Sequence, residues 1–278
     1  MNVEKLAPSV GARIDGVDLK RIDAQEVSRL RALLEEHLVL FFEDQNVLGS
    51  DLDALGCKFG QLEVAPNLPA LSDDLPHVHF LDYDGNQPRG VYSDQWHSDH
   101  SFEAQPNFSS FLSAEILPPE GGDTLWASMY AAYDALSQPL KDLCDNLQAV
   151  HGRSDQEVRE GLGVVHPVVR VHPRTGRRAL YVNSVWTRSL VGVSKTESQA
   201  ILDFLYAHCA MPDFQVRWRW TPGALAMWDN RFTQHYAILD YQSRRRMQRV
   251  TIVEGEVPLG PRDWQVARPR AEALEGAA

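Results

Sequence analysis

A histidine and an aspartate stand two positions apart in the segment Gln95-Trp96-His97-Ser98-Asp99-His100. In an extended strand, positions i and i+2 point to the same side, so His97 and Asp99 can bind one ion together. Imidazole and carboxylate suit iron(II), and one further histidine would complete a facial triad with open coordination positions. Because a His-x-Asp pair also arises often by chance, a hydrogen-bonded surface pair is the alternative interpretation.

The second histidine of such a set would be His235, which follows the segment WDNRFTQ. An isolated histidine is more often a core residue that bonds to a backbone carbonyl. The residues after it favour a functional role, because Arg245, Met247 and Arg249 alternate along one face of an expected strand. Arginines that face a core are costly unless they meet an anion, and a dicarboxylate co-substrate would supply one.

Three separated motifs resemble one known family: WHSDHSF at 96–102, GGDTLW at 121–126 and WDNRFTQHYAILDYQSRRRMQR at 228–249. In this order they closely resemble the taurine dioxygenase group of iron(II)- and 2-oxoglutarate-dependent dioxygenases. The resemblance covers nearly the whole chain, including the opening GARIDGVDL and the LVLFF segment. It implies an enzyme that uses O2 and 2-oxoglutarate to hydroxylate a substrate, with release of succinate and CO2.

The resemblance also implies roles for individual residues. His97, Asp99 and His235 would be the catalytic ligands of Fe(II), the metal cofactor. Thr124, in GGDT, would donate a hydrogen bond to the distal carboxylate of the co-substrate 2-oxoglutarate.

An arginine of the RRxMxR segment would bind the same carboxylate, and two positions compete for this role. Counting back from Met247 selects Arg245, whereas counting forward from His235 selects Arg246. Strand alternation favours Arg245, because it places this residue on the same face as Met247 and Arg249.

The substrate is expected to be a small organic anion, namely a sulfonate, a sulfate ester or a carboxylate. Arg249 and His100 are the expected substrate-binding donors, and Trp186 is expected as an aromatic wall of the pocket. Taurine itself is not favoured. Ala65 stands where taurine-specific members carry a histidine, and Leu68 stands where they tend to carry an aromatic residue.

The elements that must position these residues are expected to be mainly strands, with flanking helices. Capping boxes predict helices that start after Asp23 and Ser194, and shorter helices are expected after Ser50, in 128–136 and in 137–147. Apolar or alternating runs predict strands: Leu38–Phe42, Val164–Val171, Ala179–Asn183, Phe214–Trp220, Ala224–Asp229 and Arg245–Val253. Residues 61–95 are expected to be irregular, and 148–163 to be a mobile connection. The fold class is therefore a mainly β double-stranded β-helix (jelly roll), as one dioxygenase domain over residues 1–278.

The composition limits the partners of the chain. Its formal net charge of −11 argues against nucleic acid, although Arg244-Arg245-Arg246 forms a local basic run. The chain carries no signal peptide and no apolar run long enough for a membrane, so we expect a cytoplasmic protein without membrane contact. Its three cysteines lack metal-site or disulfide spacing and are expected to be reduced. The resemblance implies a homo-oligomer.

Three alternatives remain at this point. A cupin-type metal-dependent oxygenase would not use 2-oxoglutarate, and a non-catalytic jelly roll would bind a ligand without turnover. A rival metal site would use His77 and His79, but no nearby carboxylate completes that pair.

Overall fold

The computed structural model describes residues 1–64, 68–84 and 93–263. Its described residues form two compact units. Unit 1 contains Met1–Asp99, Asn107–Ser128 and Gln215–Gly255, and unit 2 contains His100–Pro106, Met129–Phe214 and the residues from Glu256 onward. The single domain expected over residues 1–278 remains a prediction.

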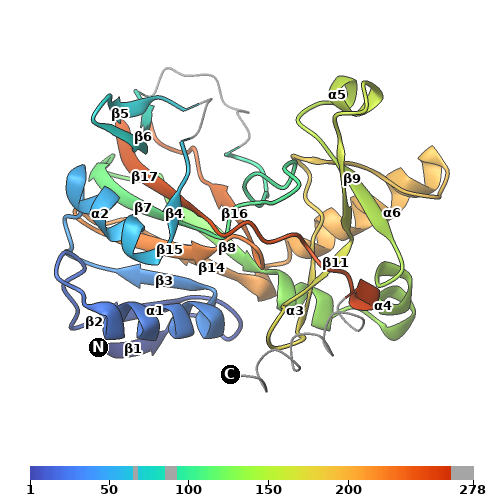
Figure 1. The fold of residues 1–278 in the computed structure, drawn as a ribbon, viewed down its shortest axis with the longest axis horizontal. Coiled ribbons are helices and arrows are strands. Elements are labelled where there is room, and N and C mark those ends of the chain that lie inside the picture. Colours follow the sequence, from blue (N-terminus) through green and yellow to red (C-terminus); the bar gives the residue numbers. More distant parts are fainter. Residues whose placement is uncertain (65–67, 85–92, 264–278) are drawn as a thin grey trace, which may run out of the picture. The chain divides into compact units, whose positions relative to one another are not determined.

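The described residues of unit 1 form two sheets and two helices, and Figure 1 shows their arrangement. The large sheet has the order β1 (Asn2–Lys5), β2 (Ala12–Asp15), β3 (Val39–Phe42), β15 (Leu225–Asp229), β7 (Ser109–Ile116), β17 (Arg245–Val253), β6 (Leu75–Tyr83) and β5 (Ala70–Ser72), with β4 (Gln61–Leu62) paired to β17. The small sheet has the order β14 (Gln215–Trp218), β8 (Thr124–Ser128) and β16 (Thr233–Ala237). The helices are α1 (Ala24–His37) and α2 (Ser50–Phe59). The prediction of a mainly β jelly roll with flanking helices is confirmed, and its sheets are not closed into a barrel.

Strand β3 of the large sheet is buried on both faces. On one face, Leu40 and Phe42 of β3 join an apolar core with α1 and α2, which cover that face in Figure 1. On the other face, Phe41 stacks on Trp218 of the small sheet at 4.4 Å and meets Trp126 edge-on at 5.3 Å between ring centroids. Burial on both sides explains why this strand is a continuous apolar run rather than an alternating one.

Local signals place α1 and α6 (Lys195–Cys209) as expected. Asp23 accepts a bond from the backbone of Glu26 while the Glu26 side chain bonds back, and Ser194 and Glu197 do the same. These boxes satisfy backbone N–H groups that the first helical turn leaves without partners. Both helix starts are confirmed.

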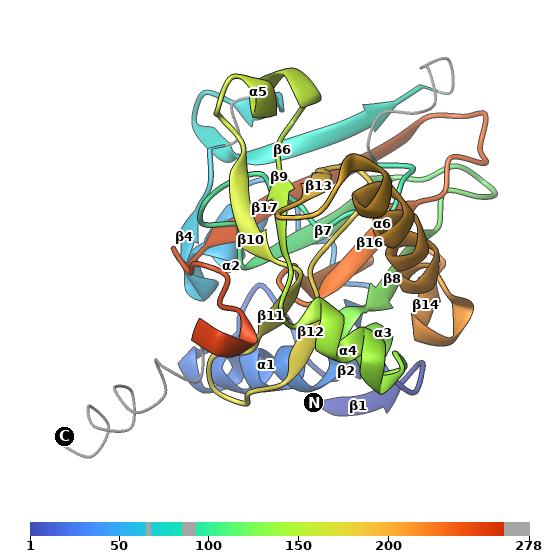
Figure 2. The same cartoon turned by 90° about the vertical axis from the view of Figure 1, so that its right-hand side faces the viewer.

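Unit 2 holds short strands and four further helices in its described part. Its strands are β9 (Gln148–His151), β10 (Val164–Pro167), β11 (Val169–Val171), β12 (Arg178–Leu180) and β13 (Thr187–Leu190). Its helices are α3 (Met129–Asp134), α4 (Gln138–Cys144), α5 (Asp155–Arg159) and α6, with a 3-10 turn at Pro212–Phe214. β9 lies between β10 and β13, and α6 packs against β13 (Figure 2).

Three expectations about secondary structure were wrong. Residues 61–95 are not irregular throughout, because Leu75–Tyr83 forms a nine-residue strand that pairs with β17. Residues 148–163 contain β9 and α5 rather than only a connection. Val164–Val171 is not one hairpin arm: it divides at Pro167, and β10 pairs with β9 while β11 pairs with β12. Proline has no N–H to donate to a ladder, which explains the break.

Candidate metal and co-substrate site

His97, Asp99 and His235 converge in unit 1, and each is buried. Their donor atoms all lie within 4.8 Å of one another. His97 Nε2 lies 3.6 Å from Asp99 Oδ1, and His235 Nε2 lies 3.7 Å from Asp99 Oδ2. Because metal–nitrogen bonds are about 2.1 Å long, adjacent ligand atoms on one ion are about 3 Å apart. Two imidazoles and one carboxylate at these separations fit a divalent metal ion.

The backbone explains why distant segments meet here. His97 and His235 exchange both backbone hydrogen bonds, at 3.2 and 2.8 Å, as an isolated antiparallel bridge beside β16. Directly opposed residues point to the same face, and the two rings have centroids 4.1 Å apart. Asp99 follows two positions later and lies in a turn rather than in the expected extended strand. Its carboxylate nevertheless reaches the two imidazoles, as the spacing predicts.

A hydrogen bond sets the tautomer of His97, and burial favours the neutral form of His235. The Nδ1 of His97 lies 2.7 Å from the carbonyl oxygen of Gln95, which can only accept, so Nδ1 carries the proton and Nε2 the lone pair. Burial, helped by His97, lowers the pKa of His235 to about 3. His235 is therefore neutral near pH 7, as metal ligation requires.

Arg249 contacts the carboxylate of Asp99, one of the three candidate metal ligands. Its Nη2 lies 2.6 Å from Asp99 Oδ2 and 3.0 Å from Ser110 Oγ, while Nη1 lies 3.4 Å from Asp99 Oδ1. The Nε of Arg249 is buried without a hydrogen-bond partner among the described residues. The sequence predicts the inward direction of Arg249, but it gives no sign that Asp99 is its partner.

Arg245 is also buried, and it lies against the GGDT turn. Its Nε donates to the carbonyl of Gly122 at 3.1 Å, whereas its Nη2 has no partner within the described part of the chain. Burial lowers the pKa of Arg245, although Tyr241, Tyr83 and Asp123 nearby oppose this shift. A buried charge is costly unless it is well paired. Gly122 has a φ of +74°, and a Cβ there would lie 3.1 Å from Arg245 Cδ. The glycine lets the turn pass close to the guanidinium.

Thr124 begins β8, immediately after this turn, and is buried. Its Oγ1 accepts a hydrogen bond from Trp220 Nε1 at 2.9 Å. Since that bond uses an acceptor lone pair, the hydroxyl proton remains available to donate to an anion.

The two neighbours of Arg245 already have carboxylate partners. Arg244 donates to Asp82 at 2.6 and 2.9 Å, and Arg246 lies 3.2 Å from Glu115. The basic run is therefore paired at both outer positions. Arg245, between them, is buried and donates to the carbonyl of Gly122, in the turn before β8.

Comparisons with known proteins identify the family. The model of the taurine catabolism dioxygenase TauD, TfdA family matches residues 2–251. The chain belongs to this family.

Relatives of known sequence and structure support the same assignment. An α-ketoglutarate-dependent sulfate ester dioxygenase of Pseudomonas putida is 36% identical, over 96% of this chain and 94% of that protein. An α-ketoglutarate-dependent sulfonate dioxygenase of Saccharomyces cerevisiae is 33% identical, over 87% of this chain and 64% of that protein. The crystal structure of a taurine dioxygenase from Burkholderia xenovorans superposes with a TM-score of 0.84 at 37% identity, over 94% of this chain and 92% of that one. The chain is thus an α-ketoglutarate (2-oxoglutarate)-dependent dioxygenase.

The other two residues expected to bind substrate in the dioxygenase lie in unit 2. Phe102 joins them into one aromatic group, with ring centroids 5.3 Å from His100 and 4.7 Å from Trp186. His100 has a φ of 52°, an uncommon conformation for a residue with a side chain. Their contact with a substrate stays a prediction. Ala65 lies outside the described residues, whereas Leu68 is described and half-buried.

The rival pair, His77 and His79, lies on β6. His77 Nδ1 lies 3.2 Å from Asp53, and His79 stands opposite Arg249 in the β6–β17 register. Within residues 1–64, 68–84 and 93–263, His97, Asp99 and His235 form the one group of three or more potential ligands that could hold a metal ion.

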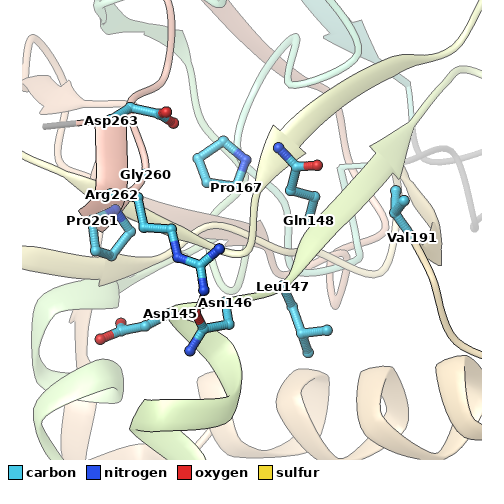
Figure 3. A pocket seen from close by; sticks show the side chains of 10 residues that line it. All are labelled: Asp145, Asn146, Leu147, Gln148, Pro167, Val191, Gly260, Pro261, Arg262 and Asp263. Carbon is cyan, nitrogen blue, oxygen red and sulfur yellow. Dashed lines mark hydrogen bonds between the residues drawn. The ribbon is translucent and has the colours of Figure 1, made fainter. Parts of the chain in front are cut away.

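A separate pocket of about 330 Å³ lies in unit 2 (Figure 3). Its charged lining residues are Asp145, Arg262 and Asp263, and Arg262 donates to Asn146. It contains none of the residues predicted for chemistry, so it is not part of the candidate site.

The described helices include no segment that is both long and apolar enough to cross a membrane.

Proposed function

We propose that this dioxygenase binds iron(II) through His97, Asp99 and His235 and oxidises a small organic sulfonate or sulfate ester. One observation carries the proposal. The three ligands share unit 1 with two buried arginines, and each arginine has an N–H without a partner among the described residues.

The donor set supports iron(II). Two neutral imidazoles and a carboxylate on one side of an ion leave its other positions open for co-substrate, oxygen or water. When bound, the metal would activate O2, with oxidation and decarboxylation of 2-oxoglutarate to succinate and CO2. The protein supplies the orientation of the two organic molecules and a site from which water is excluded.

Arg245 and Thr124 are proposed to hold the distal carboxylate of 2-oxoglutarate. The buried Nη2 of Arg245 would gain the anion that the described residues do not supply, and the Thr124 hydroxyl would donate beside it. Charge-assisted bonds of this kind are about twice as strong as neutral ones.

Arg249 is proposed to bind the anionic group of the primary substrate through its Nε. Its two Nη atoms already contact Asp99 and Ser110, so they are held in place before a substrate arrives. The names of the Pseudomonas and Saccharomyces relatives point to sulfate esters and sulfonates as that anion. We propose the same classes here, with taurine itself as a poor substrate.

A turnover assay tests the proposal. The enzyme is incubated with Fe²⁺, ascorbate, 2-oxoglutarate and a panel of alkyl sulfates, alkylsulfonates and carboxylates, and succinate is measured. Hydroxylation of the carbon next to the sulfonate or sulfate group would let that group leave as sulfite or sulfate and leave an aldehyde. We expect succinate and the released sulfur anion in equal amounts. If no alkyl sulfate or alkylsulfonate stimulated succinate formation, the substrate proposal would be contradicted.

A further inference from the structure

Asn230 is a fully buried side chain that bonds to the metal-site segment. Its Oδ1 accepts from the backbone N–H of Asp99 at 2.7 Å, and its Nδ2 donates to the backbone carbonyl of Asp99 at 2.8 Å. The amide thus satisfies both backbone groups of one metal-site residue.

The side-chain amide of Asn230 continues the hydrogen-bond pairing between residues 97–99 and β16. Residues 97–99 run beside β16, where His97 and His235 exchange backbone bonds and Ser98 Oγ donates to the carbonyl of Thr233. The register of His97 with His235 puts Thr233, the first residue of β16, opposite Asp99, but the backbone N–H and C=O of Asp99 bond to the side chain of Asn230 instead. In an antiparallel pair, one N–H and one C=O would face Asp99 at this point. The side-chain amide of Asn230 supplies the same two groups.

The amide is itself held on its other side. Its Nδ2 also donates to Asn107 Oδ1, and the backbone N–H of Asn230 donates to the carbonyl of Phe108 at 2.9 Å. The turn is tied locally as well, because Thr233 Oγ1 donates to the carbonyl of Asp229 at 2.7 Å. Asn230 therefore joins Asp99 to a rigid part of unit 1.

We propose that Asn230 is a positioning residue for metal binding, which fixes the backbone of Asp99 so that its carboxylate meets the two imidazoles. The proposal rests on the assignment of His97, Asp99 and His235 as metal ligands. Without this amide, the Asp99 carboxylate would keep its contact with Arg249, but its buried backbone N–H and C=O would lose the hydrogen bonds that fix them.

Metal affinity is the decisive measurement. The affinity of the apoenzyme for Mn²⁺ is measured for the wild type and for Asn230→Ala. Binding is detected as a loss of the EPR signal of free Mn²⁺. Loss of groups that orient metal ligands commonly weakens binding by about 10–100-fold, and we expect a change in that range. The kcat at saturating metal should fall less than the affinity.

Gln45→Ala is the matched control. Gln45 is another side-chain amide that bridges backbone segments: it accepts from Leu19 N at 3.0 Å and donates to the carbonyls of Val17 and Glu43. Its truncation should lower the Tm, as that of Asn230 does, yet leave the Mn²⁺ affinity within twofold of wild type.

Asn107→Ala tests the same idea with a milder change, because it removes the anchor of the Asn230 amide and leaves both bonds to Asp99. We expect Asn107→Ala to bind Mn²⁺ several-fold more weakly than the wild type. This effect can be measured even if Asn230→Ala does not fold. Wild-type Mn²⁺ affinity in Asn107→Ala, or in a folded Asn230→Ala, would overturn the proposal. Failure of the wild type to bind Mn²⁺ would instead contradict the metal site itself.

Discussion

The two faces of the large sheet of unit 1 use the same strands for different purposes. Toward α1 and α2, the strands present apolar side chains such as Phe111, Met227 and Val250. Toward the small sheet, β7 presents Ser110 and β17 presents Arg249, which bond to each other. One face stabilises the fold by burial of apolar area. The other buries charge, which costs free energy unless a ligand or a metal is bound.

The largest expected effect on activity comes from a substitution on the side of the large sheet that faces the small sheet. His235→Ala removes one of the proposed metal ligands, and a catalytic metal supplies several kcal/mol of transition-state stabilisation. We expect activity to fall by about a thousandfold or more. Succinate production at saturating substrate measures this, with circular dichroism to confirm that the variant is folded. A fully active variant would remove His235 from the metal site.

On the face toward α1 and α2, a substitution should lower stability and leave activity nearly unchanged. Phe111 is fully buried and packs edge-on against Phe59. Phe111→Ala should lower the free energy of unfolding by about 3–5 kcal/mol, while the kcat of the folded fraction changes little.

Ser110→Ala, one residue away on the other face, is the matched control for Phe111→Ala. It should lower the free energy of unfolding by only about 1 kcal/mol. It should also raise the KM for the primary substrate, because Arg249 loses its hydrogen bond to Ser110 Oγ. If both variants changed stability and KM alike, the two faces would not be separable.

Arg245→Ala tests whether one residue can serve binding and yet disfavour folding. Arg245 is proposed to bind 2-oxoglutarate, and its buried charge lowers the stability of the protein when 2-oxoglutarate is absent. Loss of one partner of a buried, hydrogen-bonded charge pair costs about 2–5 kcal/mol, so the KM for 2-oxoglutarate should rise by about 30-fold or more. The stability of the apoprotein should change little: the variant loses the bond from Nε to the carbonyl of Gly122, but it no longer buries a charge whose Nη2 has no partner among the described residues.

Arg246→Ala serves as the control for Arg245→Ala. Arg246 is paired with Glu115 at a partly exposed position, where an ion pair contributes little to stability. A wild-type KM for 2-oxoglutarate in Arg245→Ala, together with a raised KM in Arg246→Ala, would mean that Arg246 rather than Arg245 binds the co-substrate. A wild-type KM in Arg245→Ala alone would already contradict the proposed role of Arg245.

Gly122→Ala should have the smallest effect. The left-handed backbone costs an alanine about 1–2 kcal/mol, and its Cβ would press on Arg245. We expect a several-fold higher KM for 2-oxoglutarate. Gly161→Ala carries the same backbone strain, with a φ of +78° and nothing within 4 Å of a Cβ. If Gly161→Ala raised this KM equally, strain rather than the contact with Arg245 would be the cause.

The sequence predicts those parts of the molecule whose signals are local. The capping boxes at Asp23 and Ser194 mark helix starts because a few adjacent side chains satisfy the first turn. The direction of Arg245 follows from strand alternation, and its burial agrees with that choice over Arg246.

Features that depend on distant partners could not be predicted. The strand Leu75–Tyr83 was missed because Pro76 and polar residues on both faces hide its alternation, and its pairing with β17 makes it a strand. The sequence also gave no sign that Asn230 binds the backbone of Asp99, because 131 positions separate them. An asparagine just before a candidate ligand strand was the available signal, but asparagine is common in turns for local reasons.

Absorption spectroscopy of the anaerobic enzyme tests the central claim most directly. Addition of Fe²⁺ and 2-oxoglutarate to the wild type should produce a weak visible charge-transfer band, which His97→Ala and Asp99→Ala should lack. A wild type without the band, or a band of equal strength in His97→Ala, would contradict the claim that these residues hold the metal to which 2-oxoglutarate binds.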